Sequence, residues 1–266
     1  MRRAIVTIIV IFTVAGASGQ IVATRASAPQ LLIPAAGAQP GIGGTFFRSD
    51  ITLINYRPSE QRIRLQWLPQ DATGVGLAPT DISIAASSGI ASEDFVTNIM
   101  QKSGLGAILV TGIDSNGVFD SLAQLVATSR IWTPQPGTSG TTSQSLPSIS
   151  TADISSTNVA VLGARRDLRY RMNVGIVNLA SGTQTFQYAV FGSFGTEIHQ
   201  VDVQALSMVL IGGSGATSTT PLQIQVQNVG PPPRSSNFVT YASSIDNTTG
   251  DAWTTLGSNL PGAPPP

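Results

Sequence analysis

A ten-residue stretch of the sequence occurs twice in nearly the same form. The first copy, FFRSDITLIN, spans residues 46–55, and the second, RYRMNVGIVN, spans residues 169–178. Further matches follow in the same order, and they pair Gln61 with Gln184, Ile82 with Val201, Ile84 with Val203, Ile108 with Ile224, Val110 with Val226, and Ala127 with Tyr241. A repeat of more than about one hundred residues is too long for a solenoid or propeller unit and has the size of a complete sandwich domain. The sequence therefore predicts two copies of one domain.

Both copies show the alternating pattern of half-buried β-strands. In RIRLQWL the apolar Ile63, Leu65 and Trp67 alternate with polar residues, so Trp67 is predicted to be buried. TFQYAV and LQIQVQ alternate in the same way in the second copy, and turn-forming stretches such as SNG and DNTTGD separate the strands. Short strands at this density favour an all-β fold of two tandem immunoglobulin-like β-sandwich domains, at residues 30–133 and 158–257.

Two segments outside these domains have a biased composition. Residues 134–157 are rich in Ser, Thr, Pro and Gly, which predicts a linker between the domains. That linker is either flexible or packed along the second domain through Leu146, Ile149 and Ile154. Residues 258–266 are rich in proline and are expected to form an extended tail.

One short helix is expected within the first domain. The stretch ASEDFVTNIM, residues 91–100, has Ser92 in a suitable position for an N-cap. Glu93 and Asp94 then fall in the first turn, where the helix dipole favours acidic side chains.

The N-terminus has the form of a secretory signal peptide. Two arginines precede an apolar run over residues 4–14, and the small residues at 15–17 fit a cleavage site, so residues 1–17 are expected to be removed. The alternative is an uncleaved anchor, because apolar and small residues continue to Ala23, although Gln20 interrupts that run. No later stretch has the length and apolar character of a membrane span. We expect an exported protein of the periplasm, the cell surface or the extracellular space.

Composition narrows the classes of function. The formal net charge at pH 7 is zero, so no overall field attracts nucleic acid. The chain has no cysteine, which excludes disulfides, thiolate metal sites and cysteine nucleophiles. Its one histidine, His199, is too few for a multi-histidine zinc site. We therefore expect no cofactor, no metal site and no nucleic-acid partner.

Several stretches together resemble a known kind of protein. They include IPAAG, GGTFFRSDITLIN and SRIWT followed by GTSGTTSQSLP in the first half. In the second half they are VLGARRDLRYRMNVGIVN and VTYASSIDNTTGD. The chain resembles an uncharacterised family of exported bacterial proteins with tandem Ig-like β-sandwich domains, over nearly the whole mature sequence. The resemblance implies the architecture and the export, and it brings no catalytic residues or ligand with it.

Motifs for catalysis are weak. A Ser-His-Asp arrangement would have to use His199, which lies in EIHQVDV, where an exposed strand position explains it as well. GGSGA from Gly212 fails the G-x-S-x-G pattern at Ala216, and the sequence has no phosphate-binding or dinucleotide fingerprint. We expect no catalytic residues and no enzyme.

Two loops have the oxygen-rich composition of calcium loops. They are DSNGVFD at residues 114–120 and DNTTGD at residues 246–251. Calcium prefers six to eight oxygen ligands, but Asp and Asn also favour ordinary hairpin turns. Neither loop has the full EF-hand spacing, so both interpretations stay open, with the turn favoured.

The densest positive charge lies in RRDLRYR, residues 165–171. Its four arginines could bind an anionic ligand such as a polysaccharide. The alternative is a structural role, in which they pair with Asp167 and with acids of the other domain. Arg48 matches Arg171 in the repeat, which favours the structural role, and the same register predicts that Tyr170 points inward.

A carbohydrate-binding sandwich would need exposed aromatic residues on one surface. Trp132 and Trp253 are the two tryptophans that could serve, so their exposure distinguishes that function. The function we expect first is a non-catalytic exported β-sandwich module with an adhesion, cell-surface structural or assembly role. Its partner would be a protein or polysaccharide of the cell envelope or extracellular matrix, bound for example along an edge strand. The alternatives are a secreted carbohydrate-binding protein and, more distantly, a secreted hydrolase.

Overall fold

The computed structural model describes residues 27–41, 44–135, 137, 139–154, 158–213, 215–230 and 237–259. The expected signal peptide and residues 260–266 of the expected tail lie outside this part. The described residues are nearly all β, and every pairing between their strands is antiparallel. None of the helices in this part has the length and apolar character needed to cross a membrane.

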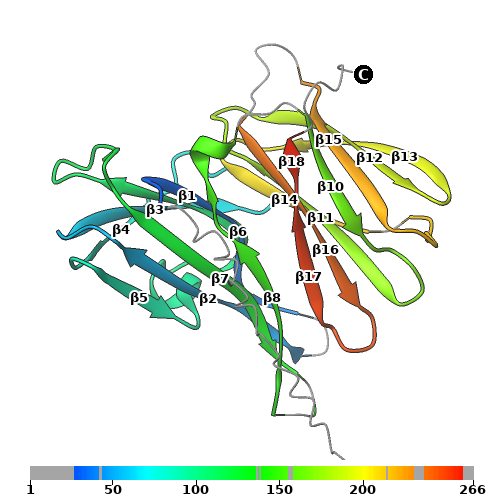
Figure 1. Cartoon of the computed structure of the whole chain (residues 1–266), viewed down its shortest axis with the longest axis horizontal. Helices are drawn as coiled ribbons and strands as arrows, with labels where there is room; N and C mark the ends of the chain where they lie inside the picture. Colours follow the sequence, from blue (N-terminus) through cyan, green and yellow to red (C-terminus); the bar gives the residue numbers. More distant parts are fainter. Residues whose placement is uncertain are drawn as a thin grey trace, which may run out of the picture.

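The strands form two β-sandwich-like units, which lie side by side in Figure 1. The first unit comprises β1 (Gln30–Pro40), β2 (Phe46–Asn55), β3 (Gln61–Pro69), β4 (Thr80–Ile84), β5 (Ser88–Ser92), α1 (Phe95–Asn98), β6 (Gly104–Ile113), β7 (Leu125–Pro134), β8 (Thr141–Pro147), β9 (Ile149–Ser150) and a 3-10 turn (Thr151–Asp153). The second comprises β10 (Asn158–Ala164), β11 (Tyr170–Asn178), β12 (Gln184–Gly192), β13 (Gly195–Val203), β14 (Ser207–Gly212), β15 (Leu222–Asn228), β16 (Phe238–Asp246), β17 (Ala252–Leu256) and β18 (Ser258–Asn259).

The two units share one pairing pattern. The second unit has one sheet with the strand order β13-β12-β15-β10-β18 and a facing sheet with the order β14-β11-β16-β17. In the first unit the strands equivalent to the first of these sheets are β4-β3-β6-β1-β9, and those equivalent to the second are β5-β2-β7-β8. The registers agree as well, because Leu65 lies opposite Val110 as Tyr188 lies opposite Val226. In the first unit β1 pairs with β6 and, at its end, with β2, so the two faces form one continuous nine-stranded sheet.

A buried asparagine ends each copy of the repeated stretch and explains why it recurs. The Asn55 side-chain amide donates to the carbonyls of Ser59, Ile84 and Ala85 at 2.8, 3.2 and 3.0 Å. The Asn178 amide donates to the carbonyls of Gly182, Val203 and Gln204 at 2.9, 3.1 and 2.9 Å. Each side-chain oxygen also accepts the amide two residues on, and neither asparagine is exposed. The same residue thus ties together two loops in each unit.

The last expected match of the repeat is wrong by one residue. Ala127 lies opposite Leu53, and Thr240 lies opposite Ile176, the residue that corresponds to Leu53. Ala127 therefore corresponds to Thr240, not to Tyr241. A shift of one residue moves a strand's side chains to the other face, so the similarity of ATS to YAS was misleading.

The expected linker contains strands. Residues 141–147 form β8, which pairs with β7 over its whole length, and β9 pairs with β1. These strands correspond to β17 and β18 of the second unit, so the first unit extends beyond residue 133. Leu146 is 2% exposed because it packs between the two units. The segment that contains it is therefore not the flexible linker that was one of the two expectations.

The short helix is present, but its cap differs from the expected one. Helix α1 spans Phe95–Asn98, and Asp94 is its N-cap, whose side chain accepts the Thr97 amide at 3.4 Å. Ser92 lies two residues earlier and accepts the Asp94 amide at 3.3 Å. Phe95 and Val96 are the buried residues of the helix, so their packing fixes where it begins.

A third apolar cluster joins the two units. Besides a core in each unit, buried residues from both form one cluster: Leu32, Ala35, Leu68, Ala107, Leu146, Val177, Met208, Val239 and Tyr241. Tyr241 is 2% exposed, and burial raises the pKa of its hydroxyl. A Cβ on Gly175 would lie 2.1 Å from the Tyr241 ring, so a glycine is required beside it. The units are therefore packed together, and β11 and β16 are covered on both faces.

Candidate interaction surfaces

The longest strand edge that the described chain leaves uncovered belongs to β13. The edge of β14 is covered by the first unit, where the Asp71 amide donates to the Met208 carbonyl at 3.0 Å. Strands β8 and β17 lie against each other through Gln144, which donates to Ser243 Oγ and Thr254 Oγ1. The edge strands β4 and β5 have five residues each, and β18 has two. Strand β13 has nine residues and pairs only with β12, at the far side of the second unit from the first (Figure 1).

The open side of β13 is suited to pairing with another strand. Its register with β12 is unbroken over all nine residues, and it contains no lysine, proline or bulge, three of the usual protections of an edge. Its charged residues are Glu197, which pairs with Arg166, and Asp202. Gly192 and Gly195 flank a two-residue turn, so they form a hydrogen-bonded pair. The backbone groups of Gly195 therefore point toward β12, and those of successive residues alternate in direction. The backbone N–H and C=O groups of Thr196, Ile198, Gln200 and Asp202 point outward, away from β12. The Ile198 side chain is 62% exposed on this strand.

A buried arginine holds β13 to the rest of the unit. Arg166 is 5% exposed, and its Nη2 lies 2.6 Å from Glu197 Oε2 on β13. Arg166 Nε also donates to the Ala216 carbonyl at 2.9 Å, while Glu197 Oε1 accepts the Ala216 amide at 2.8 Å. This network joins three segments, so the edge strand has a fixed position.

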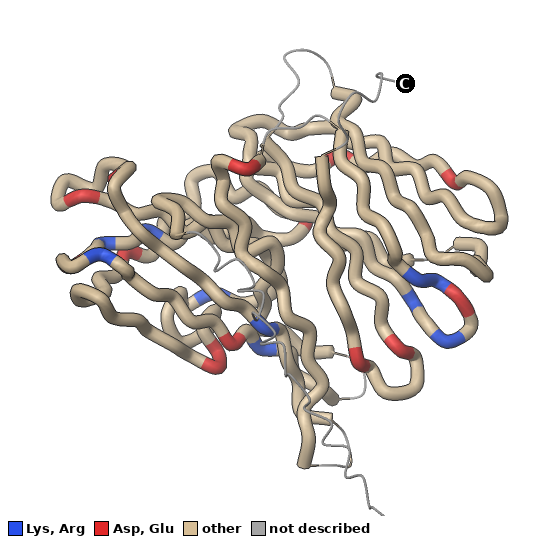
Figure 2. Tube along the Cα trace, viewed as in Figure 1, with Lys and Arg blue, Asp and Glu red and all other residues tan. Residues whose placement is uncertain are grey.

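The other arginines of RRDLRYR have mostly structural partners. Arg165 pairs with Asp167 at 2.8 Å, as expected, and Arg169 pairs with Asp246 at 2.9 Å. The partners Glu197 and Asp246 belong to the same unit, so the expected pairing with acids of the other domain is wrong. Figure 2 shows the basic and acidic residues interleaved in this region. The fourth arginine, Arg171, has no carboxylate partner among the described residues, where it donates to Asn247 Oδ1 at 3.2 Å.

Tyr170 lies at the surface among charged and aromatic neighbours. It is only half-buried, which differs from the expected inward position. The guanidinium groups of Arg165 and Arg169 lie 4.6 and 5.1 Å from its ring centre, and Trp253 contacts it edge-on at 5.2 Å. Because Tyr170 begins its strand, no facing sheet covers it there.

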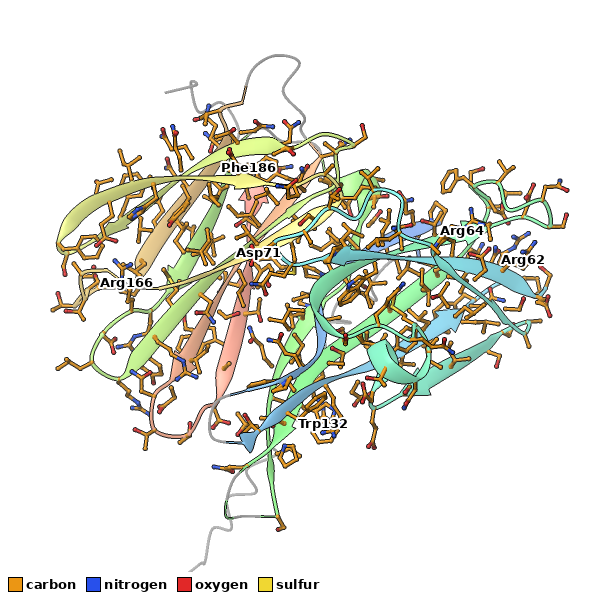
Figure 3. All side chains as sticks on the ribbon, turned by 180° about the vertical axis from the view of Figure 1, so that it is seen from behind. Arg62, Arg64, Asp71, Trp132, Arg166 and Phe186 are labelled. Carbon is orange, nitrogen blue, oxygen red and sulfur yellow. The ribbon has the colours of Figure 1, made fainter. Side chains whose placement is uncertain are left out.

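The tryptophans do not form a common platform. Trp67 is buried, as expected, at 4% exposure. Trp132 Nε1 donates to the Glu93 carbonyl at 2.9 Å. The preceding residue of β7, Ile131, packs between the two units, so the Trp132 side chain lies on the other face of that strand. Trp253 points away from Thr254, which contacts β8. Trp132 and Trp253 thus point away from the junction in different units, and Figure 3 shows Trp132 at the end of the first unit.

Both oxygen-rich loops are closed as turns. Asp114 Oδ1 accepts the amides of Asn116 and Val118 at 2.8 and 2.9 Å. Asp246 Oδ1 accepts the amides of Thr248 and Thr249 at 2.7 and 3.1 Å. These contacts are those of turns in which an Asp side chain bonds its own backbone. Within the described residues no group of three His, Asp or Glu side chains is arranged to hold a metal ion.

His199 is an exposed edge residue. Its ring stacks on Tyr188 with centres 4.9 Å apart and planes 22° apart. In the described part of the chain no hydrogen bond joins His199 to a serine or an acid. The structure therefore does not bring together the arrangement that a serine hydrolase would need.

Acid is expected to destabilise the fold, because five carboxyl groups have lowered pKa values. They are Asp81, Asp120, Asp167, Glu197 and Asp246. For Asp81 and Asp246 the main cause of the lowered pKa is a hydrogen bond from an arginine. For the other three, burial opposes ionisation, but amide and guanidinium donors together outweigh it and lower the pKa.

Such groups stabilise the folded state above their unfolded pKa of about 4, and this contribution is lost as the pH falls through the folded values. Calorimetry between pH 7 and pH 2 should therefore show a melting temperature that declines below about pH 4. A melting temperature that rises on acidification would contradict the assignment of these contacts.

Comparisons with known proteins add little to this picture. No family model and no curated protein matches the chain. Among solved structures, the chain is similar to one described as the crystal structure of Thermotoga maritima 1070. The TM-score is 0.33 and the sequence identity 15%, over 41% of this chain and 98% of that chain. A likeness at this level carries no argument about fold or function.

Proposed function

We propose that this protein is a non-catalytic exported module with an adhesion, cell-surface structural or assembly role, and that it binds its partner along β13. The observation that carries the proposal is the nine-residue edge with outward backbone groups at Thr196, Ile198, Gln200 and Asp202. An extended segment can add to such an edge through main-chain hydrogen bonds. Arg166 holds the strand in place, so β13 would lose little conformational freedom on binding.

Other features support a binding role over catalysis. The unit architecture is repeated, and the buried asparagine of each unit bonds backbone groups of the neighbouring loops. Three of the four clustered arginines are held in ion pairs. Export and the two immunoglobulin-like domains belong to this proposal, which rests on the N-terminal pattern and on the nine-strand plan of both units.

The test compares two substitutions at one position. Gln200→Pro removes an outward amide, whereas Gln200→Thr removes the same side chain and keeps the amide. The protein from Ser18 onward is mixed with the producer's cell-envelope fraction, and the bound fraction is measured. We expect binding to fall at least about tenfold with proline, which removes a main-chain donor to the added strand, and to persist with threonine. The proline variant should still fold, because the amide that it removes faces solvent at the sheet edge.

Circular dichroism and melting temperature serve as the folding control for both variants. Equal binding by Gln200→Pro and the unsubstituted protein would contradict strand addition. No retention of the unsubstituted protein on the envelope would contradict the proposed partner.

A further inference from the structure

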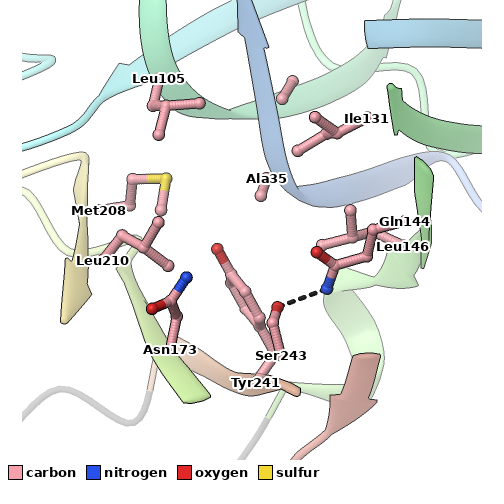
Figure 4. A pocket seen from close by; sticks show the side chains of 11 residues that line it. Ala35, Leu105, Ile131, Gln144, Leu146, Asn173, Met208, Leu210, Tyr241 and Ser243 are labelled. Carbon is pink, nitrogen blue, oxygen red and sulfur yellow. Dashed lines mark hydrogen bonds between the residues drawn. The ribbon is translucent and has the colours of Figure 1, made fainter. Parts of the chain in front are cut away.

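A groove lies between the two units, where β8 faces β16 and β17. Two adjoining hollows of about 80 and 260 Å³ share the lining residues Phe47, Thr142, Arg171 and Gly250. A third hollow, of about 60 Å³, shares Gln144 and Ile131 with the smaller of these. Figure 4 shows this inner hollow, with the Tyr241 ring projecting into it beside the Gln144–Ser243 hydrogen bond.

Arg171 differs from its counterpart in the first unit. Arg48 occupies the corresponding position, where it pairs with Asp94 at 3.4 Å and lies 4.8 Å from the Phe46 ring centre. Asp94 is the N-cap of α1, and the described part of the second unit has no α-helix between β14 and β15. The acid that neutralises Arg48 therefore has no equivalent beside Arg171.

The positive charge of Arg171 is not compensated elsewhere. Each of the other eight arginines in the described part of the chain forms an ion pair. All 14 Asp and Glu side chains lie among the described residues, and none of them forms an ion pair with Arg171. Asp251, in the neighbouring turn, forms no ion pair with it. An exposed guanidinium at the rim of a groove is therefore available to an external anion.

We infer that this groove binds an acidic polysaccharide, with Arg171 holding a sugar carboxylate. A guanidinium matches a carboxylate through two parallel hydrogen bonds. Next to it, Thr142 and Ser143 supply hydroxyl groups suited to sugar hydroxyls, Gln144 supplies a side-chain carbonyl, and Phe47 supplies an apolar face. Arg171 is the one cationic residue among those that line the hollows, and the other polar lining residues are neutral Thr, Ser, Gln and Asn. Such groups suit the neutral hydroxyls that a sugar ring carries beside its carboxylate and that the side chains of an acidic peptide lack. The site is separate from β13 and does not depend on strand addition.

Affinity electrophoresis of the purified protein tests this inference. Polygalacturonate and alginate serve as acidic probes, dextran as the neutral probe and polyglutamate as the acidic peptide probe. The matched variants are Arg171→Gln and Arg165→Gln, which change the net charge equally, but Arg165 lies outside the groove lining. We expect retardation by an acidic polysaccharide and not by dextran, weakened about tenfold or more in Arg171→Gln and less than about twofold in Arg165→Gln.

Arg171→Lys keeps the charge without the two-bond geometry, so its affinity should fall between those of the unsubstituted protein and Arg171→Gln. Four results would overturn the inference: no retardation by either acidic polysaccharide, equal losses in both glutamine variants, retardation by dextran, or stronger retardation by polyglutamate. Because an envelope polysaccharide bound in this groove would also retain the protein, the envelope assay of Gln200→Pro and Gln200→Thr is repeated in the Arg171→Gln background, where strand addition is tested independently of this site.

Discussion

Replacing Asn178 with alanine is expected to lower the free energy of unfolding by about 3–5 kcal/mol. The side chain is fully buried and makes four hydrogen bonds to the backbone, with Gly182, Val203 and Gln204 as acceptors and Ala180 as donor. Alanine would leave buried carbonyls and one amide without partners, and each such group costs about 1–3 kcal/mol. Denaturant unfolding of the purified protein measures the loss.

The repeat supplies an internal replicate of this experiment. Asn55→Ala removes the corresponding four hydrogen bonds in the first unit and should cost a similar amount. Asn98→Ala is the control, because Asn98 is exposed on α1 and its loss should change stability by less than about 0.5 kcal/mol. A loss below about 1 kcal/mol for both Asn55→Ala and Asn178→Ala would mean that water satisfies the freed carbonyls. The two asparagines would then not be what fixes the repeated loops.

The sequence predicted the features that depend on neighbouring residues. The alternation in RIRLQWL placed Trp67 inside, and the repeat paired Gln61 with Gln184, whose strand partners Ile84 and Val203 also correspond. The position of the short helix was predicted too. In each case the signal is local, because side-chain periodicity and turn chemistry act within a few residues.

Features that depend on packing between the units could not be predicted in this way. Seven of the nine β16 residues from Phe238 onward are consecutively buried, and eight consecutive residues of β1 are buried, since both strands have apolar layers on two sides. Such strands show no alternation. Strand β8, TTSQSLP, reads as a linker because it borders a polar groove and buries only Leu146.

The candidate sites were hidden for a related reason. EIHQVDV was recognisable as a strand, but its position at the edge of the sheet is set by the order in which distant strands pair, which no local pattern shows. Arg171 looked like Arg48 in sequence, but the described part of the second unit has no counterpart of α1 and so no acid in the place that Asp94 takes beside Arg48. Comparison of the two units within one chain is the signal that finds it, because each arginine is the control for the other.

Arg166→Met is expected to destabilise the protein by about 2–4 kcal/mol, because it removes the buried partner of a partly buried ion pair and its hydrogen bond to the Ala216 carbonyl. The side chains of Arg166 and Glu197 are 6% and 20% exposed, and methionine keeps much of the apolar stem while leaving the Glu197 charge unpaired. Arg165→Met is the control, because the Arg165 side chain is 47% exposed. Its ion pair with Asp167 should therefore contribute less than about 1 kcal/mol. Thermal and denaturant unfolding measure both variants.

The double variant Arg166→Met/Glu197→Met separates the ion pair from the packing around it. Removing both charges leaves no unpaired, partly buried carboxylate, so the double variant should be more stable than Arg166→Met alone. Hydrogen exchange should show the first loss of amide protection in β13, because Glu197 is the residue through which Arg166 holds that edge. A double variant less stable than Arg166→Met would mean that the hydrogen bond from the Ala216 amide to Glu197 contributes more than the unpaired charge costs. Unchanged exchange in β13 would show that pairing with β12 alone fixes the edge, and Arg166 would then have no part in presenting it to a partner.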